Sequence, residues 1–360
     1  MQAPETTADV ARALAVCNAC RYCEQYCPAF QALEQRLNFA TADVNYLANL
    51  CHGCGECLYA CQYAPPHEFA IDVPRMLAAA RVRSYEQYAW PAAFGRLFRA
   101  GSAGAVIFLA IAFTFALLGA ITARGAGVPR PLNADFYAVI SHGALVALFG
   151  GVGVFVLLAL AIGCLRAARD FASAGPVAHR AAGSVGAALR DALTLRHLHV
   201  AGADCATSLE TRTPWRRIMH QLTAYGFGLC FASTCAASLY HLAGQAAPYA
   251  YTSVPVLLGT IGGGALAVGT AGLLWQRRTR DRALTHDSQQ RIDTSFTLLL
   301  LLTGLSGLAL LALRGTPALP ELLAAHLGLV LALFVTLPYG KFVHGLYRFA
   351  ALLKYRREQE

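Results

Sequence analysis

Long apolar runs constrain the fold of this chain more than any other feature. From about residue 103 onward, apolar residues gather into six runs, each near the ~20 residues that a hydrocarbon layer about 30 Å thick requires of a helix. The whole chain is 56% hydrophobic and 14% charged, whereas a soluble domain carries about 25% charged residues. The chain is therefore predicted to cross a bilayer six times. The predicted spans are 103–122, 136–164, 218–242, 253–275, 295–313 and 322–344.

The basic residues predict how these spans are oriented. If residues 1–102 are cytoplasmic, every second connection lies on the same side. These cytoplasmic segments are the loops 165–217 and 276–294 and the tail 345–360. They hold seventeen Lys and Arg, whereas the opposite loops hold three, Arg124, Arg130 and Arg314. Because cytoplasmic loops carry the excess of Lys and Arg, both termini are predicted to be cytoplasmic.

The formal charge of +9 is mostly a consequence of this topology. Outside the loops that flank the membrane, no basic patch is interleaved with aromatic residues. Nucleic acid is therefore not an expected partner.

Eight cysteines precede the first span in two copies of one spacing. The copies are Cys17-x2-Cys20-x2-Cys23-x3-Cys27-Pro28 and Cys51-x2-Cys54-x2-Cys57-x3-Cys61. A disulfide framework needs an exported chain, but the first 16 residues lack the basic start, apolar core and cleavage site of a signal peptide. Zinc takes four ligands per site and gives no reason for three close cysteines plus a remote fourth. Iron–sulfur clusters give that reason, because in such runs three thiolates hold one cubane and the fourth holds the other.

This crossing rule assigns every cysteine of the two motifs. One [4Fe–4S] cluster is predicted on Cys17, Cys20, Cys23 and Cys61. The second is predicted on Cys51, Cys54, Cys57 and Cys27. Gln62 stands where a proline usually follows the fourth cysteine, which affects the turn and not the number of ligands. Residues 1–64 are thus predicted to form a cytoplasmic ferredoxin-like domain with two clusters.

The ionisable residues inside the spans point to haem. The six predicted ranges contain no Asp or Glu, although a transporter or proton pump usually needs carboxylates or broken helices. Apart from Cys and Tyr, their ionisable residues are Lys341 and five histidines, His142, His220, His241, His326 and His344. A neutral imidazole is a strong axial ligand of haem iron and carries no charge into lipid. A single histidine at a helix end is often only an interfacial residue, but several at matched depths predict b-type haem, two haems rather than one.

The spacing of the histidines predicts how they pair. His326 and His344 are 18 residues apart, which is five whole turns and about 27 Å of one helix. His220 and His241 are 21 residues apart, about 31 Å along the third span. With the predicted topology, His220 and His344 would hold a haem on the cytoplasmic side. His326 would hold a haem on the far side, with either His241 or His142.

The remaining positions carry weaker predictions. Lys341 is predicted either to pair with a haem propionate or to extend to the membrane interface. Residues 65–102 are read as a linker with a short amphipathic helix, and the periodicity of 185–199 predicts another helix in the loop 165–217. A metal site on His197, His199 and Cys205 is weighed against ordinary surface residues. The other cysteines are expected to act as small apolar residues: Cys164, Cys230 and Cys235.

The chain resembles the tricarballylate- or citrate-utilisation protein B family and the C-terminal part of the related corrin-biosynthesis protein CobZ. The resemblance covers nearly the whole chain. It rests on the paired cysteine motifs, on "HQLTAYGFGLCFASTCAASLYH" in the third span and on "AHLGLVLALFVTLPYGKFVHGLYR" near the end. It implies a protein of the bacterial inner membrane that reoxidises the reduced flavin of an FAD-dependent partner dehydrogenase and passes electrons to membrane quinone. Cysteines, histidines and topology alone support a wire from clusters to haem.

The predicted architecture is mainly α-helical, with a two-cluster module, a linker and a six-helix haem-binding membrane domain over 103–344. No nucleophile, acid–base pair or nucleotide-binding glycine loop is found, so substrate oxidation is expected on another subunit. Two other functions stay open. The chain could reduce a soluble substrate at a cluster, as heterodisulfide-reductase-type proteins do, although their extra cysteine motifs are absent. It could also be a membrane redox sensor, although the sequence contains no output domain.

Overall fold

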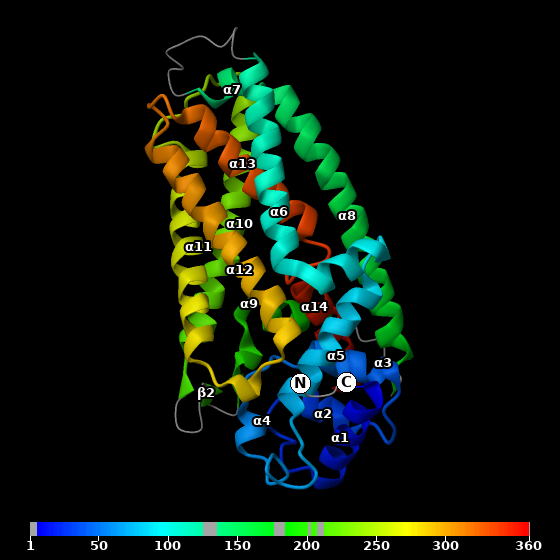
Figure 1. Ribbon diagram of the computed structural model, residues 1–360. Coiled ribbons are helices and arrows are strands. Elements are labelled where there is room, and N and C mark those ends of the chain that lie inside the picture. The colour runs from blue at the N-terminus through cyan, green and yellow to red at the C-terminus, as the bar shows by residue number, and fades with distance from the viewer. Residues whose placement is uncertain (1–5, 125–134, 176–183, 201–202, 207–211, 360) are drawn as a thin grey trace.

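In the computed structural model, a tall helical bundle stands on a smaller helical module, and both chain ends lie at the module (Figure 1). The structure describes residues 6–124, 135–175, 184–200, 203–206 and 212–359. Within these ranges it leaves out the side chains of residues 124, 184, 199, 200, 203–206, 212 and 282.

The module is built from five helices. They are α1 (Thr7–Cys20), α2 (Pro28–Glu34), α3 (Thr41–Leu50), α4 (Glu56–Tyr59) and α5 (Val73–Tyr88). Helix α1 begins at a capping box, in which the Thr6 and Asp9 side chains bond to each other's backbone N–H groups. Its core contains Leu14 and Leu47, both almost fully buried. The helix expected in the linker is present as α5, but it is buried along most of its length because it packs against α1 and α3, so it belongs to the module.

Within the part of the chain that the structure describes, six helices are long and apolar enough to cross a membrane. They are α6 (Ala92–Arg124), α8 (His142–Ser173), α10 (Trp215–Leu242), α11 (Val254–Thr279), α12 (Asp287–Ala312) and α13 (Leu319–Thr336). Their number agrees with the prediction, but several bounds differ. Helix α6 begins 11 residues before the expected start and bends at Gly101, whose φ is −151°. The second predicted span is divided into the short α7 (Phe136–Val139) and α8, so His142 opens a helix instead of lying within one.

The sixth predicted span, 322–344, is not one helix. Helix α13 ends at Thr336, a turn follows, and α14 (Val343–Gln359) begins in a new direction. Pro338 lies in this turn. It has no N–H to continue the helix, and in a helix its ring would clash with the backbone carbonyl four residues earlier. His326 and His344 therefore do not share one helix, and the five-turn argument for their positions is wrong.

Helix α14 is a structural element and not a loose tail. It lies between the module and the bundle (Figure 1). Glu358 near its end accepts bonds from Arg36 Nη2 at 2.6 Å and from the Tyr46 hydroxyl at 2.9 Å. Lys354 donates to the carbonyl of Ala174, which follows α8. One helix thus joins the cysteine-containing module to the membrane bundle.

The loop before α10 contributes a helix and short strands. Helix α9 (Ser184–Thr194) confirms the predicted helical segment and packs on α14. After it come the 3₁₀ turn η2 (Arg196–Leu198) and an antiparallel sheet of β1 (His199–Val200), β2 (Ala203–Ala206) and β3 (Arg212–Thr213) in that order. A second 3₁₀ turn, η3 (Arg282–Leu284), joins α11 to α12.

Helices α10 and α11 approach until their backbones touch. A Cβ added at Gly262 would lie 2.8 Å from the Cys230 nitrogen and 2.9 Å from the Gly226 oxygen. Gly226 and Gly269 are equally tight against the opposite backbone. Such contacts are typical of membrane helices, which associate through small residues because lipid gives no hydrophobic drive.

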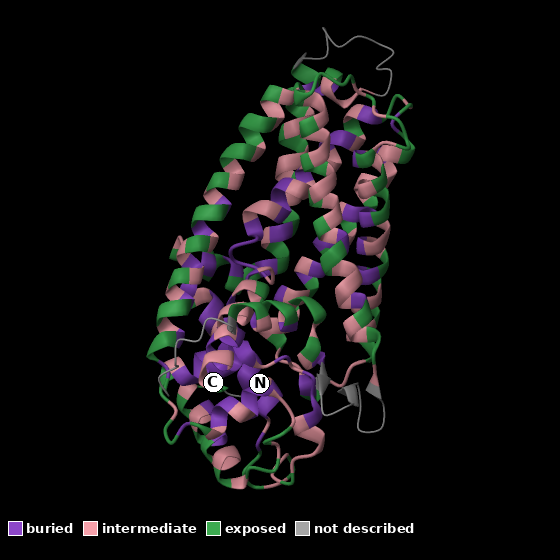
Figure 2. Ribbon diagram, turned by 180° about the vertical axis from the view of Figure 1, so that it is seen from behind, coloured by how far each residue is buried: buried purple, intermediate pink, exposed green. Residues whose placement is uncertain are grey.

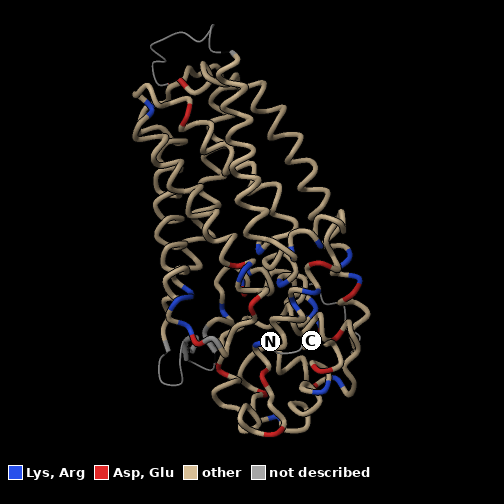
Figure 3. Tube along the Cα trace, in the orientation of Figure 1, with Lys and Arg blue, Asp and Glu red and all other residues tan. Residues whose placement is uncertain are grey.

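The outer surface of the molecule divides into two zones. Buried residues concentrate in the module, while the bundle helices are exposed along their outer faces (Figure 2). Charged residues gather in the module and at the adjacent end of the bundle, and the helices above carry almost none (Figure 3). An exposed apolar exterior with charge at its ends is what a bilayer requires, so the structure describes a membrane protein.

Candidate functional site

Four thiols line a pocket at the outer end of the module, named here the outer thiol pocket. They are Cys17, Cys20, Cys23 and Cys61. Two lie on the last turn of α1, which ends at Arg21 in the left-handed conformation (φ 54°) and so turns the chain back toward Cys23. Cys61 arrives from the second motif, just beyond α4. The cavity measures about 250 Å³, and Tyr22 on its rim is 65% exposed.

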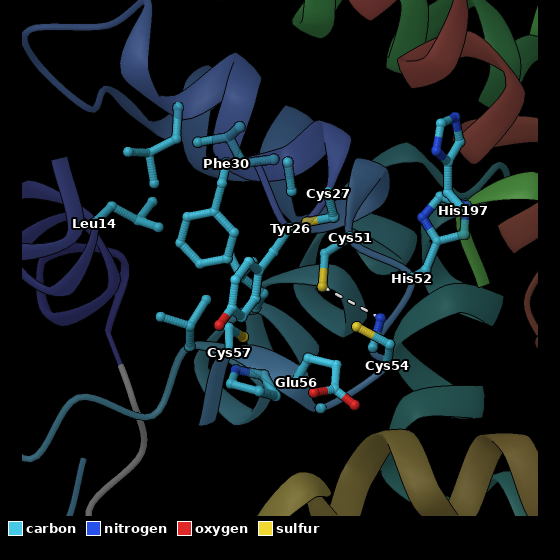
Figure 4. Close-up of a pocket in the computed structure, with 18 residues that line it drawn as sticks. Leu14, Tyr26, Cys27, Phe30, Cys51, His52, Cys54, Glu56, Cys57 and His197 are labelled. Carbon is cyan, nitrogen blue, oxygen red and sulfur yellow. Dashed lines mark hydrogen bonds between the residues drawn. The ribbon is translucent and has the colours of Figure 1, made fainter. Parts of the chain in front are cut away.

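The other four thiols line a second pocket that faces the bundle, the inner thiol pocket. They are Cys27, Cys51, Cys54 and Cys57. Cys27 caps the start of α2, and Pro28 occupies the first helical position, where a missing N–H costs nothing. Figure 4 shows the Cys51 and Cys54 sulfurs facing each other, with the Gly53 N–H donating to Cys51 Sγ at 3.3 Å. The free volume is about 20 Å³, so the thiols must separate to admit a cluster.

The sets that line the two pockets are the crossed sets predicted from the spacing. Burial, and then the neighbouring thiols, raise the pKa of Cys17 to about 12 and that of Cys23 to about 11. Burial likewise raises the pKa of Cys27 and Cys57. Such thiols are protonated on their own and become ligands when a metal takes the place of the proton.

The thiol geometry also bears on the type of metal. Zinc would draw four sulfurs to about 2.3 Å from one point. Among the described residues, no group of three or more Cys, His, Asp or Glu side chains stands close enough together to hold a metal ion. The outer thiol pocket, at about 250 Å³, has room for a cubane of several irons, whereas the thiols of the inner pocket must separate to admit one.

His220 and His344 are brought together at the end of the bundle next to the module, although they come from α10 and α14. Their ring centroids are 5.8 Å apart and the planes are inclined by 75°. Metal–imidazole bonds are about 2.0 Å long, so two axial imidazoles need about 4 Å between their coordinating nitrogens. His344 Nδ1 donates to the Lys341 carbonyl at 2.5 Å, which leaves Nε2 with its lone pair. His220 Nδ1 is buried with no partner among the described groups. Two imidazoles thus lie close together here, and His220 and His344 are candidate axial ligands.

Lys341 is engaged by a carboxylate in the structure. Its Nζ lies 2.9 Å from Asp293 Oδ1, and Arg277 lies 3.7 Å from the same carboxylate. Asp293 was outside the predicted fifth span, but α12 begins at Asp287 and includes it. Lys341 thus does not extend to the membrane interface. It could bind a haem propionate only after its ion pair with Asp293 breaks.

The far end of the bundle differs from the expected pairing. His142 and His241 stack with ring centroids 4.0 Å apart and planes 25° apart, beside Tyr137. Two stacked rings at that distance leave no room for an iron between them. His326 makes no described ring contact with either; its Nδ1 lies 3.0 Å from Ser306 Oγ on α12. As the rings stand, the far end does not fit a bis-histidine haem.

The residues given weaker predictions are placed as follows. His197 lines the inner thiol pocket, 5.6 Å from the ring of His52, and its Nε2 lies 3.3 Å from Asp191 (Figure 4). The side chains of His199 and Cys205 lie outside the described residues, so that metal site stays a prediction. The three remaining cysteines lie on helices away from the thiol pockets: Cys164 on α8, and Cys230 and Cys235 on α10.

The sequence analysis missed a set of arginines around the inner pocket. Arg81 and Arg348 donate to the Cys51 carbonyl at 2.8 and 2.9 Å. Arg216 and Arg280 donate to the Gly53 carbonyl at 2.7 and 2.6 Å. They come from α5, α14, α10 and the end of α11, so only tertiary structure unites them. The one available signal was that Arg348 follows His344 by four residues, on the same face of a helix.

Comparison with known proteins gives two family matches and one relative. Residues 102–360 match the family model described as Citrate utilization protein B, and residues 10–93 match its Fer4-like domain. The Citrate utilization protein B of Escherichia coli is 49% identical over 359 residues, which cover 99% of this chain and 93% of that protein. No solved structure matches. The Fer4-like match and the grouped thiols together indicate iron–sulfur clusters, and the chain belongs to the citrate utilization protein B family.

Proposed function

We propose that this protein is an electron-transfer protein of the bacterial inner membrane, with both termini in the cytoplasm. It takes electrons from the reduced flavin of a separate dehydrogenase similar to those that oxidise tricarballylate, and it delivers them to membrane quinone. Two [4Fe–4S] clusters, one in each thiol pocket, and a b-type haem at His220 and His344 carry the electrons. The stacked far-end histidines are left out of this route.

One observation supports the proposal most strongly. Helix α14 connects the inner thiol pocket to the His220–His344 pair. Arg348 donates to the Cys51 carbonyl at the pocket and lies four residues, about one turn, after His344. A redox protein needs its carriers close together in one chain of contacts, and these two sites share a helix.

The two pockets also suggest an order of transfer. The outer pocket is wide, and Tyr22 and Phe69 are exposed near it, 65% and 40% respectively, so a docked partner could approach it closely. The inner pocket is much smaller, about 20 Å³, and Cys54 and His52 on its wall are buried. Electrons would enter at the outer pocket and leave from the inner one.

The protein residues have three tasks in this function. The eight cysteines supply soft thiolate ligands, and burial keeps water from the clusters. The Lys341 carbonyl orients the His344 imidazole so that its free nitrogen faces the site. The six helices insulate the haem, whose iron supplies one-electron chemistry when it is bound.

The test is a flavin reoxidation assay. Membranes that contain the protein should accelerate oxidation of the partner's reduced flavin, and Cys54→Ser should abolish the acceleration. Cys235→Ser is the matched control, because this thiol is exposed on α10 and lines neither pocket. Equal rates for Cys54→Ser and the wild type would remove the clusters from the route.

A further inference from the structure

Two arginines share one acceptor beside the inner thiol pocket. Arg81 Nη2 and Arg348 Nη2 both donate to the carbonyl oxygen of Cys51, and the two arginines also bond to the carbonyls of Ala48 and Asn49. Arg81 comes from α5 of the module and is 3% exposed. Arg348 comes from α14. Two guanidinium groups are therefore held together at the backbone of a thiol ligand.

This pair is electrostatically unbalanced. Arg81 has a glutamine, Gln289, as its only described side-chain partner. Neither arginine forms an ion pair with a carboxylate among the residues that the structure describes, and the nearby Asp293 is taken by Lys341 and Arg277. Like charges in a buried site repel strongly, and carbonyl dipoles offset that only in part. A stable arrangement of this kind requires a neighbouring anion.

The inner thiol pocket supplies that anion. A cluster with four thiolate ligands is negatively charged and gains a further negative charge on reduction, so nearby fixed cations favour the reduced form. Among the described residues, no equivalent pair of arginines lines the outer pocket. Arg21, within the first cysteine motif, is exposed and bonds to the Asn18 carbonyl of its own helix, where solvent screens its charge.

We propose that Arg81 and Arg348 form a guanidinium clamp that holds the cluster of the inner pocket at a higher reduction potential than the cluster of the outer pocket. The clamp makes the inner pocket the point from which electrons leave the module. One electron moves at a time, oxidising the outer cluster and reducing the inner one, with no bond made or broken. The inference rests on the proposed function, because it requires both clusters.

The test is a redox titration of the purified full-length protein followed by EPR. Cys54→Ser identifies the signal of the inner cluster. Arg348→Gln and Arg81→Gln should each lower the reduction equilibrium constant of that cluster about tenfold, about 59 mV for a one-electron couple. The outer cluster should keep its wild-type potential. Arg348→Lys retains the charge and should keep the inner cluster near the wild-type potential.

Arg166→Gln is the matched control, because Arg166 also donates to a backbone carbonyl between module and bundle, that of Ala89, away from both pockets. It should shift neither potential. If Arg348→Gln loses iron, Arg81→Gln and Arg348→Lys provide the same comparison. The proposal is overturned if fully loaded glutamine variants keep the wild-type inner potential, or if both clusters shift equally. Wild-type protein without two clusters would instead refute the proposed function, and the clamp with it.

Discussion

At the residue scale, the eight cysteines are organised by burial and by contact with one another. A thiol buried among other thiols holds its proton, as the pKa of about 12 at Cys17 indicates. Such a group has little use as a free nucleophile, but metal binding releases the proton and converts it into a ligand. The thiol pockets are therefore suited to metal and poorly suited to nucleophilic catalysis.

Replacing Cys27 tests the crossing of ligands. Cys27 belongs to the first motif but lines the inner pocket. Cys27→Ser should remove or convert the cluster of Cys51, Cys54 and Cys57, with loss of up to half of the protein-bound iron, while the outer cluster keeps its EPR signal. Cys164→Ser is the control and should change neither signal. Damage restricted to the outer cluster would contradict the assignment.

Replacing His220 or His344 tests the haem site at the end of the bundle next to the module, called here the near haem. Removing one axial imidazole leaves an open position, so His220→Ala and His344→Ala should each lose the absorbance of the near haem while both cluster signals persist. His286→Ala, at a partly buried histidine just before α12, serves as control and should retain the haem. Full haem content and a bis-imidazole spectrum in both alanine variants would exclude the pair.

The sequence predicted these residues with unequal success, for physical reasons. The thiol sets follow from motif spacing, because in such runs three cysteines hold one cubane and the fourth holds the other. His220 and His344 lie close together, as the predicted topology led us to expect, but the five-turn spacing of His344 from His326 fails, since His344 is on α14. The arginines around the inner pocket come from four separate elements: Arg81, Arg216, Arg280 and Arg348. Periodicity within one segment carries no information about contacts between elements.

At the element scale, the predicted spans were reliable where apolar length alone decides and unreliable at breaks. The fifth span agrees with α12 because its central run is uniformly apolar. The sixth predicted span was wrong at Pro338. The apolar run continues past this residue, but the helix cannot, and α13 ends at Thr336. The helix α14 that results then carries both His344 and Arg348.

The contact between α10 and α11 predicts a sharp difference between two glycines. Gly262→Ala places a Cβ 2.8 Å from the opposite backbone and should cost about 1–3 kcal/mol of stability. Gly264→Ala, two residues further along α11, meets no atom within 4 Å and should be neutral or slightly stabilising. Thermal unfolding of both variants in detergent checks this. Equal melting temperatures would show that the helices do not pack through Gly262.

Helix α9 is predicted to loosen in mild acid. Burial lowers the pKa of His197 below its ordinary value, against the opposing effect of Asp191. The folded protein then binds fewer protons than the unfolded chain, so stability is lost as the pH falls below about 6.5. The protection factors of the α9 amides, which correct for the slower intrinsic exchange at lower pH, should fall between about pH 7.5 and about pH 5.5.

The control for this pH effect is His197→Gln, which cannot titrate. In this variant, the protection factors of the α9 amides should fall less over the same pH range. Asp191 accepts hydrogen bonds from Arg356. Burial raises the pKa of Asp191, but the bonds to Arg356 and His197 outweigh burial and keep this pKa below its ordinary value, so Asp191 contributes only at lower pH. An unchanged pH response in His197→Gln would assign the loosening to another group.

At the scale of the whole molecule, charge and burial divide the protein into a soluble end and a membrane end. The module, α14 and the loop with α9 gather the charged residues and the buried core, and the six spans carry the exposed apolar surface (Figures 2 and 3). The inner thiol pocket and the pair of His220 and His344 lie where these zones meet. This arrangement suits a protein that receives electrons in water and delivers them into lipid.

The central claim is that one chain holds both clusters and a haem. An EPR and optical spectrum of the purified, dithionite-reduced protein tests this claim most directly. The account predicts two [4Fe–4S] signals that interact magnetically, together with the reduced bands of a bis-histidine b-type haem. A protein that contains zinc in place of iron, or that shows clusters with no haem bands, would contradict it.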